Sequence, residues 1–134
     1  MISFSERRDI EIAQILPLYE SHNWSSAKKP QILYQALVNS HTLISAWDSE
    51  RLVGIGNAIS DGFLVVYYPH LLVHPEYQGQ GIGQKMMNLL KKHYETMHMH
   101  MLVADSDAIL FYQKCGFTRA GKTEPMWIYA GDDH

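Results

Sequence analysis

Three glycines in five residues stand between an apolar run and a long amphipathic segment. The run covers residues 63–73, the glycines are Gly79, Gly81 and Gly83, and the amphipathic segment begins at Ile82. A strand, a glycine loop and a helix in this order expose successive backbone N–H groups at the positive end of the helix dipole. The pattern therefore predicts a strand–loop–helix unit that binds an anion. A glycine-rich turn with no ligand is the alternative reading of the same residues.

The spacing of these glycines excludes two familiar nucleotide-binding motifs. A dinucleotide-binding fingerprint requires a third glycine where Gln84 stands. A P-loop requires Gly-Lys-Ser/Thr, whereas here Lys85 follows Gln84. The sequence therefore predicts an anion-binding loop that is neither a dinucleotide-binding fingerprint nor a P-loop.

The first half of the chain changes its hydrophobic period from helical to strand-like. We expect a short strand at 2–6, a helix from Asp9 to about His22 that Pro17 kinks or ends early, and a second short helix after Pro30. Apolar, β-branched runs then predict three strands, at 41–47, 51–60 and 63–73. Short turn sequences separate the strands, which predicts an antiparallel meander with a bulge or a splayed edge near Pro69.

The second half alternates helix and strand. The helix that follows the glycine loop leads to a predicted buried strand at 99–104, and a further helix ends at Gly116. Closing strands are expected at 117–120 and 126–130. The predicted order is β-α-α-β-β-β-α-β-α-β-β, which is an α+β fold. The unit at 71–104 implies one parallel pair of strands.

Two segments together resemble the GCN5-related N-acetyltransferase (GNAT) superfamily. Leu72-Val73-His74-Pro75-Glu76-Tyr77-Gln78-Gly79-Gln80-Gly81-Ile82-Gly83 resembles the family's acyl-CoA signature, a valine-proline strand end followed by Gln/Arg-x-x-Gly-x-Gly/Ala. The segment 105–117, which ends in Phe111-Tyr112-Gln113-Lys114-Cys115-Gly116-Phe117, looks like the family's later helix. The element order also matches over nearly the whole chain. The resemblance is to a small, single-domain, bacterial-type member. It implies a GNAT fold: a mixed, mostly antiparallel central sheet flanked by about four helices.

The resemblance implies a single N-acetyltransferase domain over 1–134 that uses acetyl-CoA as co-substrate. The acetyl group would pass to a primary amine of a small molecule or peptide, by direct attack in a ternary complex. The residues that the resemblance assigns to the cofactor are Leu71, Leu72, Val73, Gln78, Gly79, Gln80, Gly81, Ile82, Gly83, Gln84, Phe111 and Tyr112. One position departs from the family pattern: Asp105 stands where the family usually has an asparagine that contacts the cofactor. A carboxylate lacks the amide's N–H donors and repels a pyrophosphate.

Two residues are candidates for the proton transfers. Tyr112 is the residue that the resemblance assigns as general acid, because a phenol keeps its proton at neutral pH and can give it to a leaving thiolate. Its helical spacing from Ala108 also fits a core aromatic residue. His70 lies just before the cofactor strand and titrates in the range of a general base. The alternatives for His70 are an ordinary edge residue and an ordered water as base.

Composition limits the partners. Eleven Lys and Arg residues against fourteen Asp and Glu give a net charge of −3, which argues against a nucleic-acid partner. One cysteine makes no internal disulfide and predicts a reducing compartment. No apolar run reaches the roughly 20 residues of a membrane span, and charged residues come too early at the N-terminus for a secretory signal. We expect a cytoplasmic protein with no metal, no membrane partner and the possibility of a homodimer.

Two other functions compete with the enzyme reading. One is an acyl-CoA sensor that keeps the cofactor site without turnover, which the departure at Asp105 favours. The other is an interaction module with an empty glycine loop. Release of thiol in the presence of amines distinguishes the enzyme from the sensor, and stabilisation by acetyl-CoA distinguishes both from the module.

Overall fold

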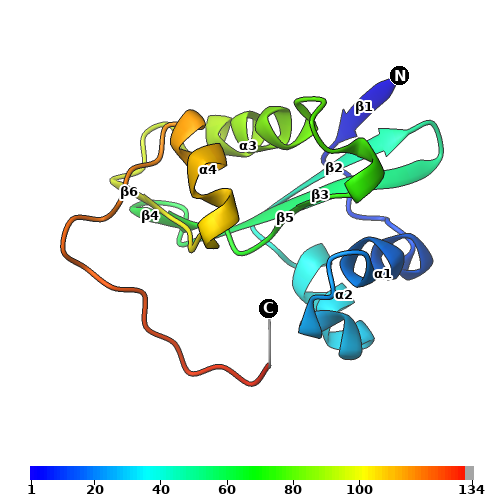
Figure 1. Ribbon diagram of the computed structural model, residues 1–134, viewed down its shortest axis with the longest axis horizontal. Helices are drawn as coiled ribbons and strands as arrows, with labels where there is room; N and C mark the ends of the chain where they lie inside the picture. The colour runs from blue at the N-terminus through cyan, green and yellow to red at the C-terminus, as the bar shows by residue number, and fades with distance from the viewer. Residues whose placement is uncertain (132–134) are drawn as a thin grey trace.

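The predicted meander forms the centre of one six-stranded sheet. A computed structural model describes residues 1–131, in which the strands are β1 (Ile2–Ser5), β2 (Thr42–Asp48), β3 (Arg51–Ser60), β4 (Val65–Tyr67), β5 (Leu71–Val73) and β6 (Met99–Met101). The strand order is β1-β2-β3-β4-β6, and β5 pairs with β3 beside this path (Figure 1). All pairs are antiparallel except β4 with β6, which are parallel.

Helices cover the two faces of the sheet unequally. The elements α1 (Ile12–Glu20), η1 (Ser25–Lys28) and α2 (Pro30–Val38) lie on one face, and α3 (Ile82–Lys92) and α4 (Ile109–Lys114) lie on the other (Figure 1). Two short 3₁₀ turns, η2 (Pro75–Tyr77) and η3 (Ser106–Ala108), precede α3 and α4. Because successive strand side chains alternate between faces, Leu43 of β2 joins the core on the α1 side and Ile44 joins the core on the α3 side.

The third predicted strand breaks at Pro69, as expected from a residue that cannot donate to a strand ladder. β4 ends at Tyr67 and β5 begins at Leu71. The buried Asn57 on β3 closes the break, since its side-chain Oδ1 accepts from the His70 amide at 3.0 Å and its backbone N–H donates to the His70 carbonyl at 3.1 Å. The parallel partner of β6 is therefore β4, and not the segment 71–73 that the sequence suggested.

The prediction of two closing strands, at 117–120 and 126–130, is wrong. No strand forms within 117–131, and Met126 and Trp127 are 93% and 71% exposed. A strand needs a partner to satisfy its backbone groups and a face to bury, whereas residues 118–130 are exposed and pair with no strand of the described chain. The predicted buried strand at 99–104 is only three residues long, and Met99 and Met101 are exposed, because α1 and α2 cover β3 and β5 but not β6.

Two smaller points concern the helices. Pro17 lies inside α1 without ending it, so the helix does not take the early break that the sequence allowed. The C-cap of α4 is Cys115, and Gly116 follows with φ 98°, as expected. No helix within residues 1–131 is both long enough and apolar enough to cross a membrane.

Candidate active site

The glycine loop has the open shape that a ligand cradle requires. Gly79 and Gly81 have φ values of 80° and 81°, and Gly81 is the N-cap of α3. A Cβ placed on either residue would have no atom within 4 Å, so both face open space. Gly83 has a different role, because a Cβ there would lie 3.2 Å from Cζ of Phe111. The first two glycines expose the backbone, and the third lets α3 pack against α4.

The backbone amides of this loop lack partners. From Gly79 to Gln84, six successive N–H groups donate to no residue in the part of the chain that the structure describes. The first amide to donate is that of Lys85, to the Gly81 carbonyl at 3.1 Å. These groups stand at the N-terminus of an eleven-residue helix, where the dipole favours negative charge. The loop therefore fits an anion such as a pyrophosphate without any cationic side chain.

The outer edge of β5 carries the next set of backbone groups. Leu72 lies opposite Ile55, and the alternation of an antiparallel pair directs the backbone groups of Leu71 and Val73 away from β3. The Val73 carbonyl accepts from Nε2 of His22 at 2.8 Å and from Nε2 of Gln78 at 3.1 Å. The amide of Val73 and both backbone groups of Leu71 remain on the edge that no strand covers.

Tyr112 lies on α4 beside this edge, with its ring packed and its hydroxyl accessible. Its ring contacts Phe111 at 5.0 Å and Phe117 at 6.0 Å between centroids. The hydroxyl bonds to no residue within 1–131 and is not among the fully buried polar atoms there. Burial of the ring, with smaller contributions from Cys115 and Asp105, raises the pKa of Tyr112 to about 12. The phenol is thus a proton donor over the whole physiological range.

His70 lies at the break between β4 and β5, on the face that α1 covers. Its Nδ1 is 2.7 Å from the hydroxyl of Tyr19 in α1. The rings of Tyr19 and Trp24 contact its ring edge-on, with centroids 5.4 and 5.1 Å away. His70 is therefore a partly buried residue that aromatic side chains hold in place.

The predicted site residues form two groups on opposite faces of the sheet. Tyr112, Phe111 and the loop belong to the α3 side, and His70 belongs to the α1 side. No hydrogen bond or ring contact in the described chain joins Tyr112 to His70. The two tyrosines before the break differ in the same way. Tyr67 is exposed, whereas Tyr68 is buried on the α3 side with its hydroxyl 2.8 Å from Nδ1 of His100.

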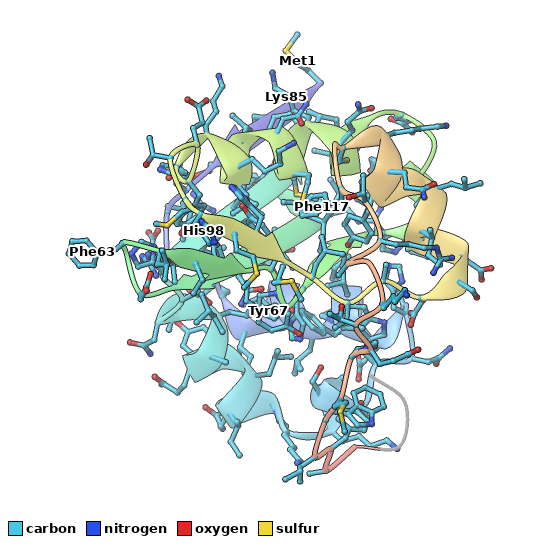
Figure 2. All side chains as sticks on the ribbon, turned by 90° about the vertical axis from the view of Figure 1, so that its left-hand side faces the viewer. Met1, Phe63, Tyr67, Lys85, His98 and Phe117 are labelled. Atoms are coloured by element: carbon cyan, nitrogen blue, oxygen red, sulfur yellow. The ribbon has the colours of Figure 1, made fainter. Side chains whose placement is uncertain are left out.

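Figure 2 shows the contrast between the two faces, with Tyr67 below the strands and Phe117 above them. Sequence reasoning missed Tyr19 and Asn57. Tyr19 fits the apolar stripe of a helix, so nothing in its spacing revealed its hydrogen bond. Asn57 did carry a signal, since it is a polar residue in the middle of an apolar strand.

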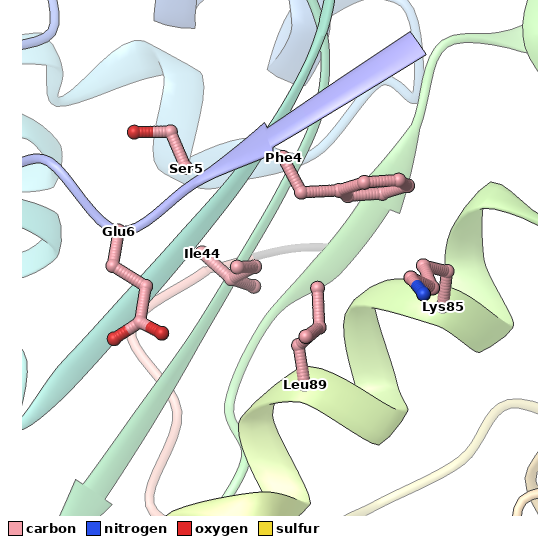
Figure 3. A pocket seen from close by; sticks show the side chains of 6 residues that line it. All are labelled: Phe4, Ser5, Glu6, Ile44, Lys85 and Leu89. Atoms are coloured by element: carbon pink, nitrogen blue, oxygen red, sulfur yellow. The ribbon is translucent and has the colours of Figure 1, made fainter.

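A separate surface hollow of about 490 Å³ lies between β1 and α3. Phe4, Ser5, Glu6, Ile44, Lys85 and Leu89 line it (Figure 3). It is open and shallow, and its carboxylate is 3.0 Å from Nε2 of His93. It lies away from the glycine loop amides and Tyr112, so we do not include it in the site. No three His, Cys, Asp or Glu side chains converge as metal ligands among residues 1–131.

The fold and the loop agree with known proteins. Residues 9–125 match the family model described as "Acetyltransferase (GNAT) domain". The chain belongs to the GNAT family of acetyltransferases. It is 31% identical over 126 residues to the uncharacterized N-acetyltransferase ycf52 of Porphyra purpurea, covering 88% of this chain and 71% of that one.

Solved structures agree with the GNAT assignment. A GNAT-family acetyltransferase from Streptococcus pneumoniae TIGR4 superposes with a TM-score of 0.84 at 27% identity, covering 97% of this chain and 99% of that one. An aminoglycoside N-acetyltransferase in complex with CoA superposes with a TM-score of 0.71 at 11% identity, over 96% and 93% of the two chains. The second likeness concerns the fold alone. The protein is thus a GNAT N-acetyltransferase, and the expectation of an acyltransferase enzyme is confirmed.

Proposed function

We propose that this protein transfers the acetyl group of acetyl-CoA to a primary amine of a small molecule or peptide, by direct attack in a ternary complex. The observation that carries the proposal is the row of six unpartnered amides at residues 79–84. A GNAT neighbour that was solved with CoA supports the choice of donor. In this proposal the N-acetyltransferase domain covers residues 1–134.

The residues present fit acetyl-CoA as co-substrate. The amides of Gln78 to Gln84 would hold the pyrophosphate, with Ile82 buried beneath them. The open edge of Leu71, Leu72 and Val73 would hold the pantetheine arm through its unpaired amide and carbonyl groups. Phe111 and Tyr112 would flank this edge from α4. Asp105 is exposed and lies near Tyr112, so this proposal gives its carboxylate no contact with the anion.

The bound thioester would supply the acetyl group. The amine nitrogen forms a bond to the carbonyl carbon, the carbon–sulfur bond breaks, and the sulfur leaves as a thiolate. Tyr112 would give its proton to that thiolate, because its hydroxyl is unpartnered within the described chain and keeps its proton at neutral pH until the thiolate forms. A backbone amide of β5 would stabilise the oxyanion, a role that is worth about 3 kcal/mol. His70 or an ordered water would receive the proton of the amine.

The proposal for the acceptor and for the partners rests on composition and on the residues of the α1 face. A net charge of −3 supports a small-molecule or peptide acceptor and no nucleic-acid or membrane partner. The exposed ring of Tyr67 and the partly buried Trp24 and Tyr34 lie on the α1 face, where they would line the acceptor site. A single cysteine supports a cytoplasmic location. A homodimer is compatible with the proposal.

The test is an amine panel with detection of released thiol. Acetyl-CoA is mixed with protein and with amino acids, aminoglycosides, arylamines and short peptides, and each product is identified by its mass. We expect acceptor-dependent thiol release with N-acetyl products. Thermal stabilisation by acetyl-CoA is measured in parallel and is expected to follow its concentration. If acetyl-CoA stabilises the protein but no amine of a broad panel is acetylated, the donor site stands and the proposed acceptor class is contradicted. If acetyl-CoA does not stabilise the protein, the donor site itself is contradicted.

A further inference from the structure

Tyr19 is a buried hydroxyl with a single hydrogen-bond partner. Its side chain is 0% exposed in the last turn of α1. Its hydroxyl is 2.7 Å from Nδ1 of His70, and it bonds to no other group in residues 1–131. A buried O–H without an acceptor destabilises the folded protein. The proton of this hydroxyl therefore has one place to go, the Nδ1 lone pair.

The direction of this hydrogen bond determines the tautomer of His70. Burial raises the pKa of Tyr19, so the phenol keeps its proton and remains the donor. A neutral imidazole has one N–H and one acceptor nitrogen. Because Nδ1 accepts from Tyr19, the ring proton of the neutral His70 is on Nε2.

The ring of His70 is also fixed in orientation. Asn57 bonds to both backbone groups of His70, at 3.0 and 3.1 Å. Tyr19 and Trp24 contact the ring edge-on, at interplanar angles of 64° and 69°. A ring flip would put Cδ2 in the place of Nδ1, and it would leave the Tyr19 proton opposite a carbon. The backbone hydrogen bonds and the aromatic contacts thus fix the orientation of the ring, and the Tyr19 hydroxyl fixes its tautomer.

We infer that Tyr19 is a positioning residue that holds His70 with its proton on Nε2, so that His70 serves the acceptor as a hydrogen-bond donor and not as a base at Nε2. The consequence for catalysis rests on the proposed function, in which His70 is one of two acceptors for the amine proton. The ordered water, and not His70, therefore receives the amine proton. The substrate amine would carry, near its nitrogen, an oxygen atom that accepts a hydrogen bond from His70.

The tautomer is tested without any activity measurement. Protein labelled with ¹⁵N gives two-bond ¹H–¹⁵N correlations for each histidine ring, and the signals of His70 are those lost in His70→Gln. We expect a protonated Nε2 and a hydrogen-bonded, unprotonated Nδ1. In Tyr19→Phe the Nδ1 signal moves to the position of a free ring nitrogen. A protonated Nδ1 in the parent protein, or an Nδ1 signal that Tyr19→Phe leaves in place, would overturn the inference.

A matched control comes from the opposite side of the sheet. Tyr94 is equally buried, and its hydroxyl is 2.7 Å from Nδ1 of His41. Tyr94→Phe removes a similar hydroxyl from a similar histidine, and it shifts the signals of His41 while those of His70 stay in place. Comparison of Tyr94→Phe with Tyr19→Phe distinguishes a general loss of stability, which both variants share, from a specific effect on His70.

Kinetics with an acceptor from the amine panel test the role of His70. Glutamine at position 70 keeps an N–H donor near the place of Nε2 and has no basic nitrogen. His70→Gln is expected within about tenfold of the parent kcat/KM, and His70→Ala at least tenfold below His70→Gln. Tyr19→Phe lowers kcat/KM about tenfold, and Tyr94→Phe leaves it unchanged. Equal losses in His70→Gln and His70→Ala would contradict the donor role. An absence of turnover in the parent protein contradicts only the proposed function, because the spectra still report the tautomer.

Discussion

Buried tyrosines in this protein differ in what their hydroxyls contact, and that contact determines what each can do. The hydroxyls of Tyr19, Tyr68 and Tyr94 each lie within 2.8 Å of a histidine nitrogen. These three therefore hold structure or orient a partner. The ring of Tyr112 is packed, but its hydroxyl has no partner in the described chain. Tyr112 thus combines a fixed ring with a proton that is available to a ligand.

Replacement of Tyr112 tests this difference at the residue scale. Tyr112→Phe keeps the ring contacts and removes the proton that the leaving thiolate requires. We expect kcat to fall about 10²- to 10⁴-fold, while the dissociation constant of acetyl-CoA changes less than about threefold. Steady-state kinetics and calorimetric titration measure the two quantities. Tyr94→Phe is the control, because it removes a hydroxyl outside the site. A normal kcat with a good acceptor would remove Tyr112 from the role of general acid.

At the scale of elements, the N-terminus of α3 and the break between β4 and β5 form the site. The loop exposes amides because Gly79 and Gly81 adopt positive φ. The break exposes one edge of β5 because Pro69 interrupts the ladder and Asn57 bonds to the His70 backbone in its place. Each element leaves backbone groups unpaired where a ligand can use them, and a protein of net charge −3 can bind an anion in this way.

The loop is tested by a side chain at Gly81. A Cβ there has no protein atom within 4 Å, so valine would occupy the open space in front of the amides. We expect Gly81→Val to weaken CoA binding at least about 100-fold, measured by calorimetry. The positive φ of 81° also costs about 1–2 kcal/mol of stability for a residue with a side chain.

Gly121→Val provides the matched control. Gly121 has a φ of 66° and likewise no atom within 4 Å of a Cβ, but it lies in the segment after α4. This variant carries similar backbone strain and is expected to bind CoA like the parent protein. Equal affinities in all three proteins would show that the loop does not hold the pyrophosphate.

The strand break is tested at Asn57. Asn57→Leu removes the acceptor for the His70 amide and the donor to Oγ of Ser40, at 3.0 and 2.9 Å. The buried partners are left unsatisfied, so we expect the free energy of unfolding to fall by about 2–4 kcal/mol. Urea titration measures this change, and hydrogen exchange should show faster exchange at His70. The exposed Asn39→Ala is the control, with an expected loss below about 1 kcal/mol. A similar small loss in Asn57→Leu would contradict the role of Asn57 in holding the break.

On the scale of the whole molecule, the sheet separates two apolar cores. One core joins α1 and α2 to β2, β3 and β5, and the other joins α3 and α4 to the opposite face. Each core contains tyrosines whose pKa values burial raises, among them Tyr19 and Tyr112. The folded protein thus keeps phenol protons that the unfolded chain loses near pH 10.

This difference predicts a loss of stability at alkaline pH. Where the folded state binds more protons than the unfolded state, the free energy of unfolding falls as pH rises. The stabilisation is complete below about pH 10, the ordinary pKa of tyrosine, and is lost above it through the raised pKa values, about 12 for Tyr112. Melting temperatures from pH 8 to 11.5 should fall most steeply above pH 10. Tyr19→Phe should flatten this fall, and a parallel curve for that variant would contradict the prediction.

Local patterns determined much of this protein. The glycine spacing, the period of each segment and the break at Pro69 predicted the sheet, the helices and the anion loop, because each depends on neighbours in sequence. The resemblance carried by residues 72–83 and 105–117 indicated the family, which the comparisons confirm. The assignments of Tyr112 and His70 to proton transfer stay predictions.

Only the tertiary structure decided which strands have partners and which side chains meet. The segments at 117–120 and 126–130 have strand-like composition, yet they form no strand, because they pair with no strand of the described chain and their side chains after Phe117 are exposed. Tyr19 and His70 are 51 residues apart in sequence, and their hydrogen bond exists because α1 packs across the break in the sheet. Pairing and burial are relations between distant residues, so a local pattern of composition and spacing does not determine them.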